Sequence, residues 1–185
     1  MKKYFLHSVL LAGCTGTLLL SSCEKNMDTY SAGAGINFYA AKKTDTSKII
    51  SFLYYSDSKM LDTVWLELET IGRLSDEDRP VLLKQSLTGT DDAQPGVHYI
   101  PFDDNALKDS YVMPAGESRV SIPVVLKRDA SLKTKDYILK LELGVNEYFR
   151  LLKPTRNVAV IVISDQINKP ANWNFYADHF WGAYG

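Results

Sequence analysis

The chain has very few cysteines and histidines, and its acidic and basic residues are nearly equal in number. Of its 185 residues, two are cysteine and three are histidine, and both cysteines lie at or before position 23. Residues 24–185 therefore offer no thiol for a disulfide, a thiolate metal site or a cysteine nucleophile. With 21 basic and 22 acidic residues, the chain also lacks the basic surplus that attracts nucleic acid.

Residues 1–22 have the pattern of a lipoprotein signal peptide. Lys2 and Lys3 precede an apolar run that ends in Leu20-Ser21-Ser22-Cys23. The run is too short to cross roughly 30 Å of hydrocarbon, which favours an export signal over a membrane span. We expect the mature protein to begin at Cys23, where acyl chains, palmitate among them, add about 0.8 kcal/mol of membrane affinity for each buried CH₂.

A second cleavage box, Leu11-Ala12-Gly13-Cys14, lies closer to the ideal consensus. Cleavage at Cys14 would leave three leucines exposed at the start of the mature chain and would shorten the apolar core of the signal. We therefore favour Cys23. Residues 23–35 are polar, small and glycine-containing, so we expect a flexible tether there. The remaining chain divides into a folded domain over 36–167 and an aromatic-rich segment over 168–185.

The folded domain shows a hydrophobic period of two, which predicts β-strands with one buried face. The alternation is clearest in Val64–Leu68, Val120–Leu126 and Tyr137–Leu143, and Val158–Ile163 is apolar on both faces. Further strands are expected at Ile36–Ala40, Ile49–Tyr54 and Pro80–Leu87. Turn-forming residues separate these runs, which favours an all-β, immunoglobulin-like antiparallel sandwich of about seven strands. Pro123 cannot donate to a ladder, so its strand should be an edge strand or carry a bulge.

Several of these signals together resemble the Calx-beta type of immunoglobulin-like sandwich, over about residues 60–165. They are Ala93-x-x-Gly96-x-His98-Tyr99, Pro114-Ala115-Gly116-Glu117, the Val120–Leu126 alternation, Asp129, and Tyr137-x-Leu139-x-Leu141. Ile71-Gly72, Asp78-Arg79-Pro80 and Pro170-x-x-Trp173, with the lipoprotein signal, are more specifically similar to an uncharacterised family of Bacteroidota lipoproteins. Members of that family are often encoded beside a SusC-like TonB-dependent transporter and its SusD-like lipoprotein partner.

The resemblance implies a calcium site that this chain does not match. Calx-beta domains that bind calcium use an acidic residue at the position of His98 and an acid-rich loop at residues 128–136. Here that loop contains Lys133 and Lys135, which add positive charge where Ca²⁺ needs six to eight oxygen ligands. We expect no metal and no cofactor at this loop.

Catalytic patterns are weak throughout the chain. A nucleophilic triad needs a histidine beside a serine or threonine, and only His98 and His179 remain beyond the signal. We interpret His98 as a residue that bonds a loop. Carboxylates that could form a hydrolytic pair occur only in turns, where they commonly bond their own backbone; they are Asp76, Glu77, Asp78, Asp91, Asp92, Asp103 and Asp104.

Aromatic side chains are the better candidates for a binding site. Residues 170–184 contain six aromatics, and the helical spacing of Trp173, Tyr176, Phe180 and Tyr184 predicts a short helix that opens at Pro170. With Trp181, this segment would cap the sandwich, contact a protein partner or stack on sugar rings. Trp65, on the outward face of its strand, is a further candidate for ligand or partner binding.

The sequence thus favours a non-enzymatic, lipid-anchored β-sandwich on the outer membrane, facing the cell surface. Its expected role is that of an accessory subunit of a SusC/SusD-type nutrient-uptake complex, acting by binding and positioning. A direct glycan-binding module that uses Trp65, Trp173 and Trp181 is the alternative, and a hydrolase is a second alternative.

Overall fold

The computed structural model describes residues 34–40, 46–152 and 156–166, which belong to the second of two compact units, Gly33–Gly185. Its strands are β1 (Ala34–Phe38), β2 (Ser47–Ser51), β3 (Leu61–Ile71), β4 (Arg79–Pro80), β5 (Leu83–Gln85), β6 (Val112–Met113), β7 (Arg119–Lys127), β8 (Tyr137–Leu143), β9 (Phe149–Leu151) and β10 (Val158–Ser164). Short 3₁₀ turns lie at Phe52–Tyr54, Lys108–Ser110 and Ala130–Lys133. The described residues include no helix long and apolar enough to span a membrane.

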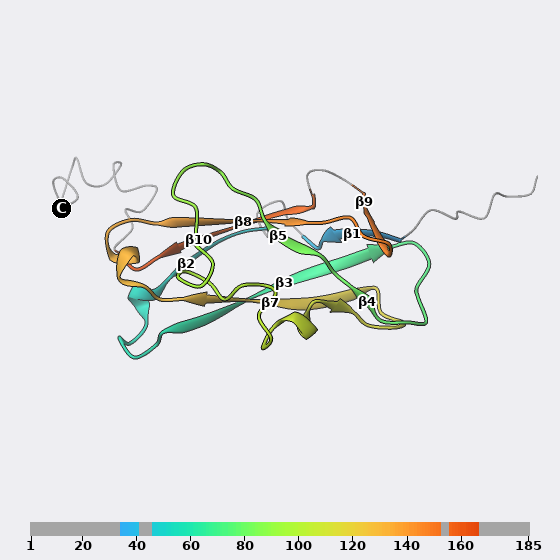
Figure 1. Cartoon of the computed structure of the whole chain (residues 1–185), viewed down its shortest axis with the longest axis horizontal. Helices are drawn as coiled ribbons and strands as arrows, with labels where there is room; N and C mark the ends of the chain where they lie inside the picture. The colour runs from blue at the N-terminus through green and yellow to red at the C-terminus, as the bar shows by residue number, and fades with distance from the viewer. Residues whose placement is uncertain (1–33, 41–45, 153–155, 167–185) are drawn as a thin grey trace, which may run out of the picture. The chain divides into compact units, whose positions relative to one another are not determined.

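The strands form two four-stranded sheets, in the orders β7-β3-β1-β9 and β2-β10-β8-β5, and β4 pairs with β6 in a small third sheet. Figure 1 shows β8 and β10 in one layer and β3 and β7 in the other. Most pairings are antiparallel, whereas β1 pairs with β9 and β2 pairs with β10 in parallel. This arrangement confirms the expected all-β, immunoglobulin-like sandwich, with ten strands among the described residues where about seven were expected and with two parallel pairings in a sandwich expected to be antiparallel.

Alternating side chains from both sheets fill the space between them. In β3, Val64, Leu66 and Leu68 are buried while the residues between them are exposed or half-buried. The same alternation buries one side of β7, β8 and β10, so that the two inner faces form one core. The period-two pattern thus identified the inward-facing residues correctly, because a strand presents successive side chains to opposite faces.

Two expected strands are interrupted. The run Ile49–Tyr54 is a strand only to Ser51, whose side chain accepts a hydrogen bond from the Leu53 N–H and caps the 3₁₀ turn that follows. The run Pro80–Leu87 is divided into β4, which pairs with β6, and β5, which pairs with β8. The break lets the chain pass from the small β4-β6 sheet to the sheet that contains β8, a long-range arrangement that local alternation does not report.

Pro123 lies in an edge strand, as its missing donor predicted, since β7 is the outermost strand of its sheet. Pro123 stands opposite Trp65 of β3. Its carbonyl oxygen accepts a hydrogen bond from the Tyr111 hydroxyl at 3.0 Å, and the next-but-one carbonyl, that of Val125, accepts from the Ile100 N–H at 2.9 Å. These groups face away from β3, so the proline costs the ladder no hydrogen bond.

The connection from Ser86 to Tyr111 bonds to a strand of each sheet. Near its start, the backbone of Asp91 and Ala93 exchanges hydrogen bonds with Ile138 of β8. Further along, the His98 carbonyl accepts from the N–H of Lys127 in β7. This connection therefore fastens β8 of one sheet to β7 of the other, and it carries the groove described below.

Candidate functional site

The sequence-predicted binding residues divide into one that the structure describes and five that it does not. Trp65 is 56% exposed on the outer face of β3, as its place in the alternation predicted. Its backbone carbonyl accepts a hydrogen bond from the Lys48 ammonium at 2.8 Å. The aromatic candidates of the C-terminal segment lie outside the described residues; they are Trp173, Tyr176, Phe180, Trp181 and Tyr184.

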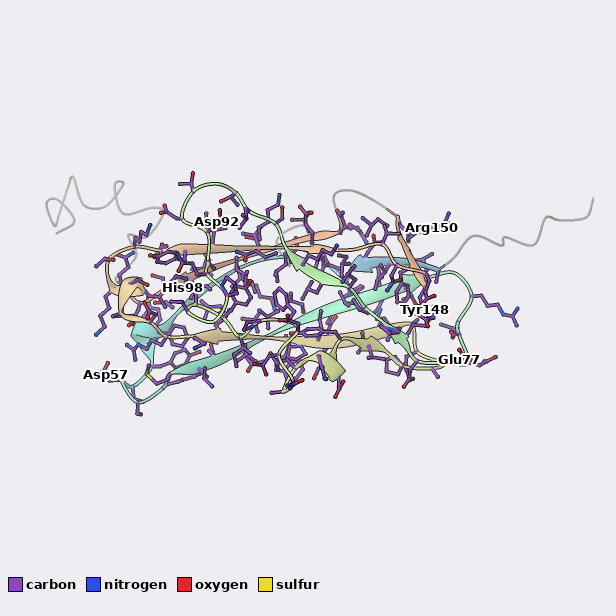
Figure 2. All side chains as sticks on the ribbon, in the orientation of Figure 1. Asp57, Glu77, Asp92, His98, Tyr148 and Arg150 are labelled. Carbon is purple, nitrogen blue, oxygen red and sulfur yellow. The ribbon has the colours of Figure 1, made fainter. Side chains whose placement is uncertain are left out.

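His98 is the most deeply buried polar side chain of the Ser86–Tyr111 connection. Only 1% of the residue is exposed, and its ring packs on that of Tyr137 with centroids 3.9 Å apart. The Gln94 N–H donates to Nδ1 at 2.9 Å, and Nε2 lies 2.9 Å from the Ser131 Oγ. Figure 2 shows His98 between the two layers of strands and Asp92 on the outer turn of the same connection.

These contacts fix the tautomer of His98. Because a backbone N–H can only donate, Nδ1 must offer its lone pair, and the proton of the neutral ring must then sit on Nε2. Nε2–H therefore donates to Ser131 Oγ, and that hydroxyl donates in turn to Asp129 Oδ1 at 2.6 Å. From His98 through Ser131 to Asp129 each proton points away from the imidazole, so the ring cannot act as a general base toward Ser131.

Burial sets the charge state of this cluster. Desolvation lowers the pKa of His98 below its usual value, assisted by the charge of Lys135 and opposed by that of Asp129. Hydrogen bonds from the Ser131 side chain and backbone lower the pKa of Asp129. The Ser131 hydroxyl thus lies between a neutral imidazole and a carboxylate. The hydrogen bond between His98 and Ser131 joins the 94–98 turn to the 129–131 turn.

Three acidic residues of the predicted turns accept hydrogen bonds from backbone N–H groups. The Asp92 carboxylate accepts from the N–H groups of Thr88 and Gly89, whose hydrogen bonds lower its pKa, chiefly that from Thr88. Asp78 accepts from the Ala115 N–H, and Asp104 accepts from the Ala106 N–H. Asp92 and Asp104 thus stabilise their own turns, as turn chemistry predicted, whereas Asp78 joins its turn to the distant turn that contains Ala115.

Two basic side chains of the 128–136 loop likewise form ion pairs with acidic residues of the protein. Lys135 forms a 2.6 Å ion pair with Asp91, and Arg128 forms a two-point ion pair with Asp165, whose side chain is buried. The part of the chain that the structure describes contains no cluster of three or more histidine, cysteine or acidic residues that could hold a metal ion.

An open groove beside the His98 turn is a candidate site that sequence reasoning missed. It has a volume of about 510 Å³ and lies between residues 80–83, the 95–103 turn and residues 108–112. Three aromatic rings line it: Tyr99 and Phe102 stack with centroids 5.2 Å apart, and Phe102 meets Tyr111 edge to face at 5.9 Å. Phe102 is the half-exposed member of the three.

The polar groups of the groove lie at its rim. Asp103, Lys108 and Asp109 are exposed, whereas the walls are prolines, aliphatic side chains and aromatic rings. Tyr99 donates its hydroxyl to Gln85 Oε1 at 2.8 Å, and Tyr111 donates to Pro123, so both hydroxyls are occupied inside the protein. Burial raises the pKa of Tyr111 to about 12. The arrangement offers an apolar surface with charged edges.

The fold defines the protein as an immunoglobulin-like β-sandwich with an aromatic groove along one edge. Within that class, the chain belongs to the family described as a domain of unknown function, DUF4843, whose model matches residues 30–185. A comparison with curated proteins gave no match.

The chain is also similar to several solved structures. A protein of unknown function from Bacteroides ovatus shares 17% identity at a TM-score of 0.46, with 74% of this chain and 45% of that chain covered. A candidate carbohydrate-binding protein from the same species shares 16% at 0.44, with 72% and 37% covered. CBD12 from CALX1.2 shares 13% at 0.44, with 71% and 44% covered. The chain thus spans less than half the length of each of these structures.

We predict that His98 makes the stability of the fold depend on pH. Because burial lowers its pKa in the folded state, the folded protein binds fewer protons than the unfolded chain just below pH 6.5. The contribution is complete above that pH and is lost as the pH falls. Urea unfolding at a series of pH values from 7.5 to 5 should show a declining free energy of unfolding.

The His98→Asn variant tests the assignment, because its amide oxygen can accept from Gln94 without titrating. We expect it to cost about 1–3 kcal/mol at pH 7.5 and to flatten the decline between pH 6.5 and 5. His179→Asn is the matched control and should keep the decline. A decline that persists unchanged in His98→Asn would assign the effect to other groups.

Proposed function

We propose that this protein is a non-enzymatic binding module, anchored by acyl chains on Cys23 to the outer membrane and facing the cell surface. Its partners would be a SusC-like transporter and a SusD-like lipoprotein. It would act as their accessory subunit by binding and positioning.

The groove is the observation that carries the binding role. It combines a half-exposed aromatic ring, rigid proline walls and exposed charges, which is the composition of a surface that recognises a partner. Of the described residues that line it, none is a serine, cysteine or histidine. The chain's His–Ser–Asp cluster lies beside it, but its protons run in the wrong direction for nucleophilic catalysis.

The tether supports the positioning role. The expected tether overlaps β1 at Ala34 and Gly35, so residues 23–33 would join the anchored cysteine to the sandwich and keep the module close to proteins in the same membrane. Under this arrangement a weak contact becomes effectively intramolecular, because a short flexible linker gives an effective concentration in the millimolar range. A modest groove is then sufficient for stable association.

Direct glycan binding is the second candidate, and the exposure of Trp65 favours it. The indole stands on the outer face of β3 opposite Pro123, where the ring is free to stack on a sugar. Loss of polysaccharide binding in Trp65→Ala, measured on a glycan array, would support this candidate over the accessory role.

We predict that acylation occurs at Cys23. The Cys23→Ala variant, expressed in the native host, should lose both its acyl chains and its cleavage before residue 23, because Cys23 is the residue expected to be acylated and to begin the mature protein. Cys14→Ala is the matched control and should keep both. Intact mass spectrometry of the mature protein distinguishes them, and an acylated Cys23→Ala protein would place the cleavage at Cys14 instead.

We predict that the tagged protein co-purifies from detergent-solubilised outer membranes with a transporter of the SusC type and a SusD-like lipoprotein. Mass spectrometry of the eluate is the measurement, and a tagged, unrelated lipoprotein expressed at the same level is the control. Recovery of neither partner above the control would contradict the accessory role.

A further inference from the structure

The floor of the groove discriminates between kinds of ligand. A sugar ring carries hydroxyl groups on most of its carbon atoms, and each one that leaves water without a new hydrogen bond costs free energy. The two tyrosine hydroxyls of the floor are already bonded to Gln85 and to Pro123. The floor therefore favours a guest that presents aliphatic or proline side chains.

The walls favour a guest in an extended conformation. Pro80, Pro95 and Pro101 line the groove together with the Phe102 ring. Grooves lined by aromatic rings are typical sites for proline-containing segments, because the polyproline II conformation is already formed in the free peptide and loses little entropy on binding. The volume of about 510 Å³ lies within the range of about 300–1,000 Å³ found for ligand pockets.

The rim adds a preference for charge. Two carboxylates, Asp103 and Asp109, stand against a single ammonium group, Lys108. The field of Asp103 reaches the floor, since its charge adds to the effect of burial in raising the pKa of Tyr99. A positively charged side chain at the edge of the guest would therefore be attracted to the rim.

We infer that the groove binds an extended segment of a partner protein, which lays a proline or aliphatic side chain on Phe102 and places a lysine or arginine beside Asp103 and Asp109. The inference deepens the proposed function, on which it rests, because it names the surface and the kind of segment through which the module holds its partner.

Fluorescence anisotropy with two labelled decapeptide libraries tests the inference. Both libraries contain Pro-x-x-Pro, and they differ only in whether the flanking charged position is arginine or glutamate. The arginine library should bind and the glutamate library should not. Phe102→Ser should weaken binding by about tenfold or more, as truncation of a central aromatic contact typically does.

A charge variant tests the contribution of the rim to binding separately from that of the floor. The double variant Asp103→Asn/Asp109→Asn should remove the preference for arginine over glutamate. Asp104→Asn is the matched control: this residue is also exposed but does not line the groove, and asparagine keeps the oxygen that accepts from Ala106. It should bind both libraries as the wild type does. Circular dichroism of each variant verifies that the sandwich is intact.

Three outcomes would overturn the inference: no peptide binding, a preference for the glutamate library, or binding of cellohexaose or mannohexaose that Phe102→Ser abolishes. Membrane co-purification with Phe102→Ser distinguishes this failure from that of the proposed function. If the peptides fail while the uptake proteins still co-purify with Phe102→Ser, the accessory role stands and a surface other than the groove carries it.

Discussion

The candidate site depends on the hydrogen bonds made by the buried imidazole of His98. A neutral ring that accepts from the Gln94 N–H and donates to Ser131 holds two turns together, one from the Ser86–Tyr111 connection and one from the loop after β7. Every polar atom of the ring has a partner, so the cost of removing it from water is offset. The same ring packs on Tyr137 of β8, which fixes the turn against the second sheet.

The groove follows from this junction. Tyr99 succeeds His98 directly, and Phe102 lies three residues further, so the position of the turn decides where both rings stand. The backbone bond from Ile100 to Val125 and the hydroxyl bond from Tyr111 to Pro123 then hold the connection along the outer edge of β7. Because Pro123 has no N–H to donate, a further strand cannot pair with this stretch of β7. A side-chain hydrogen bond from Tyr111 contacts the edge instead. An immunoglobulin-like sandwich thereby gains an aromatic recess without adding a domain.

Much of the fold could be predicted from the sequence because alternation is a local signal. Val64–Leu68, Val120–Leu126 and Tyr137–Leu143 each showed which side chains face the core, and Pro123 marked an edge. The breaks after Ser51 and Pro80 could not be predicted in this way, since they occur where the chain changes sheets. The groove was missed for the same reason: its walls come from three separated segments, and no local pattern shows that these segments meet. The proline content of residues 95–101 was the one local signal available.

The central claim is that His98 is a structural junction, neutral and protonated on Nε2, rather than a base. Long-range ¹H–¹⁵N correlation spectroscopy of the imidazole measures this directly at pH 7. We predict an unprotonated Nδ1, which accepts from the Gln94 N–H, and a protonated Nε2, which donates to the Ser131 hydroxyl. A ring protonated on Nδ1, with Nε2 free to accept the serine proton, would contradict this assignment and make His98 a candidate general base.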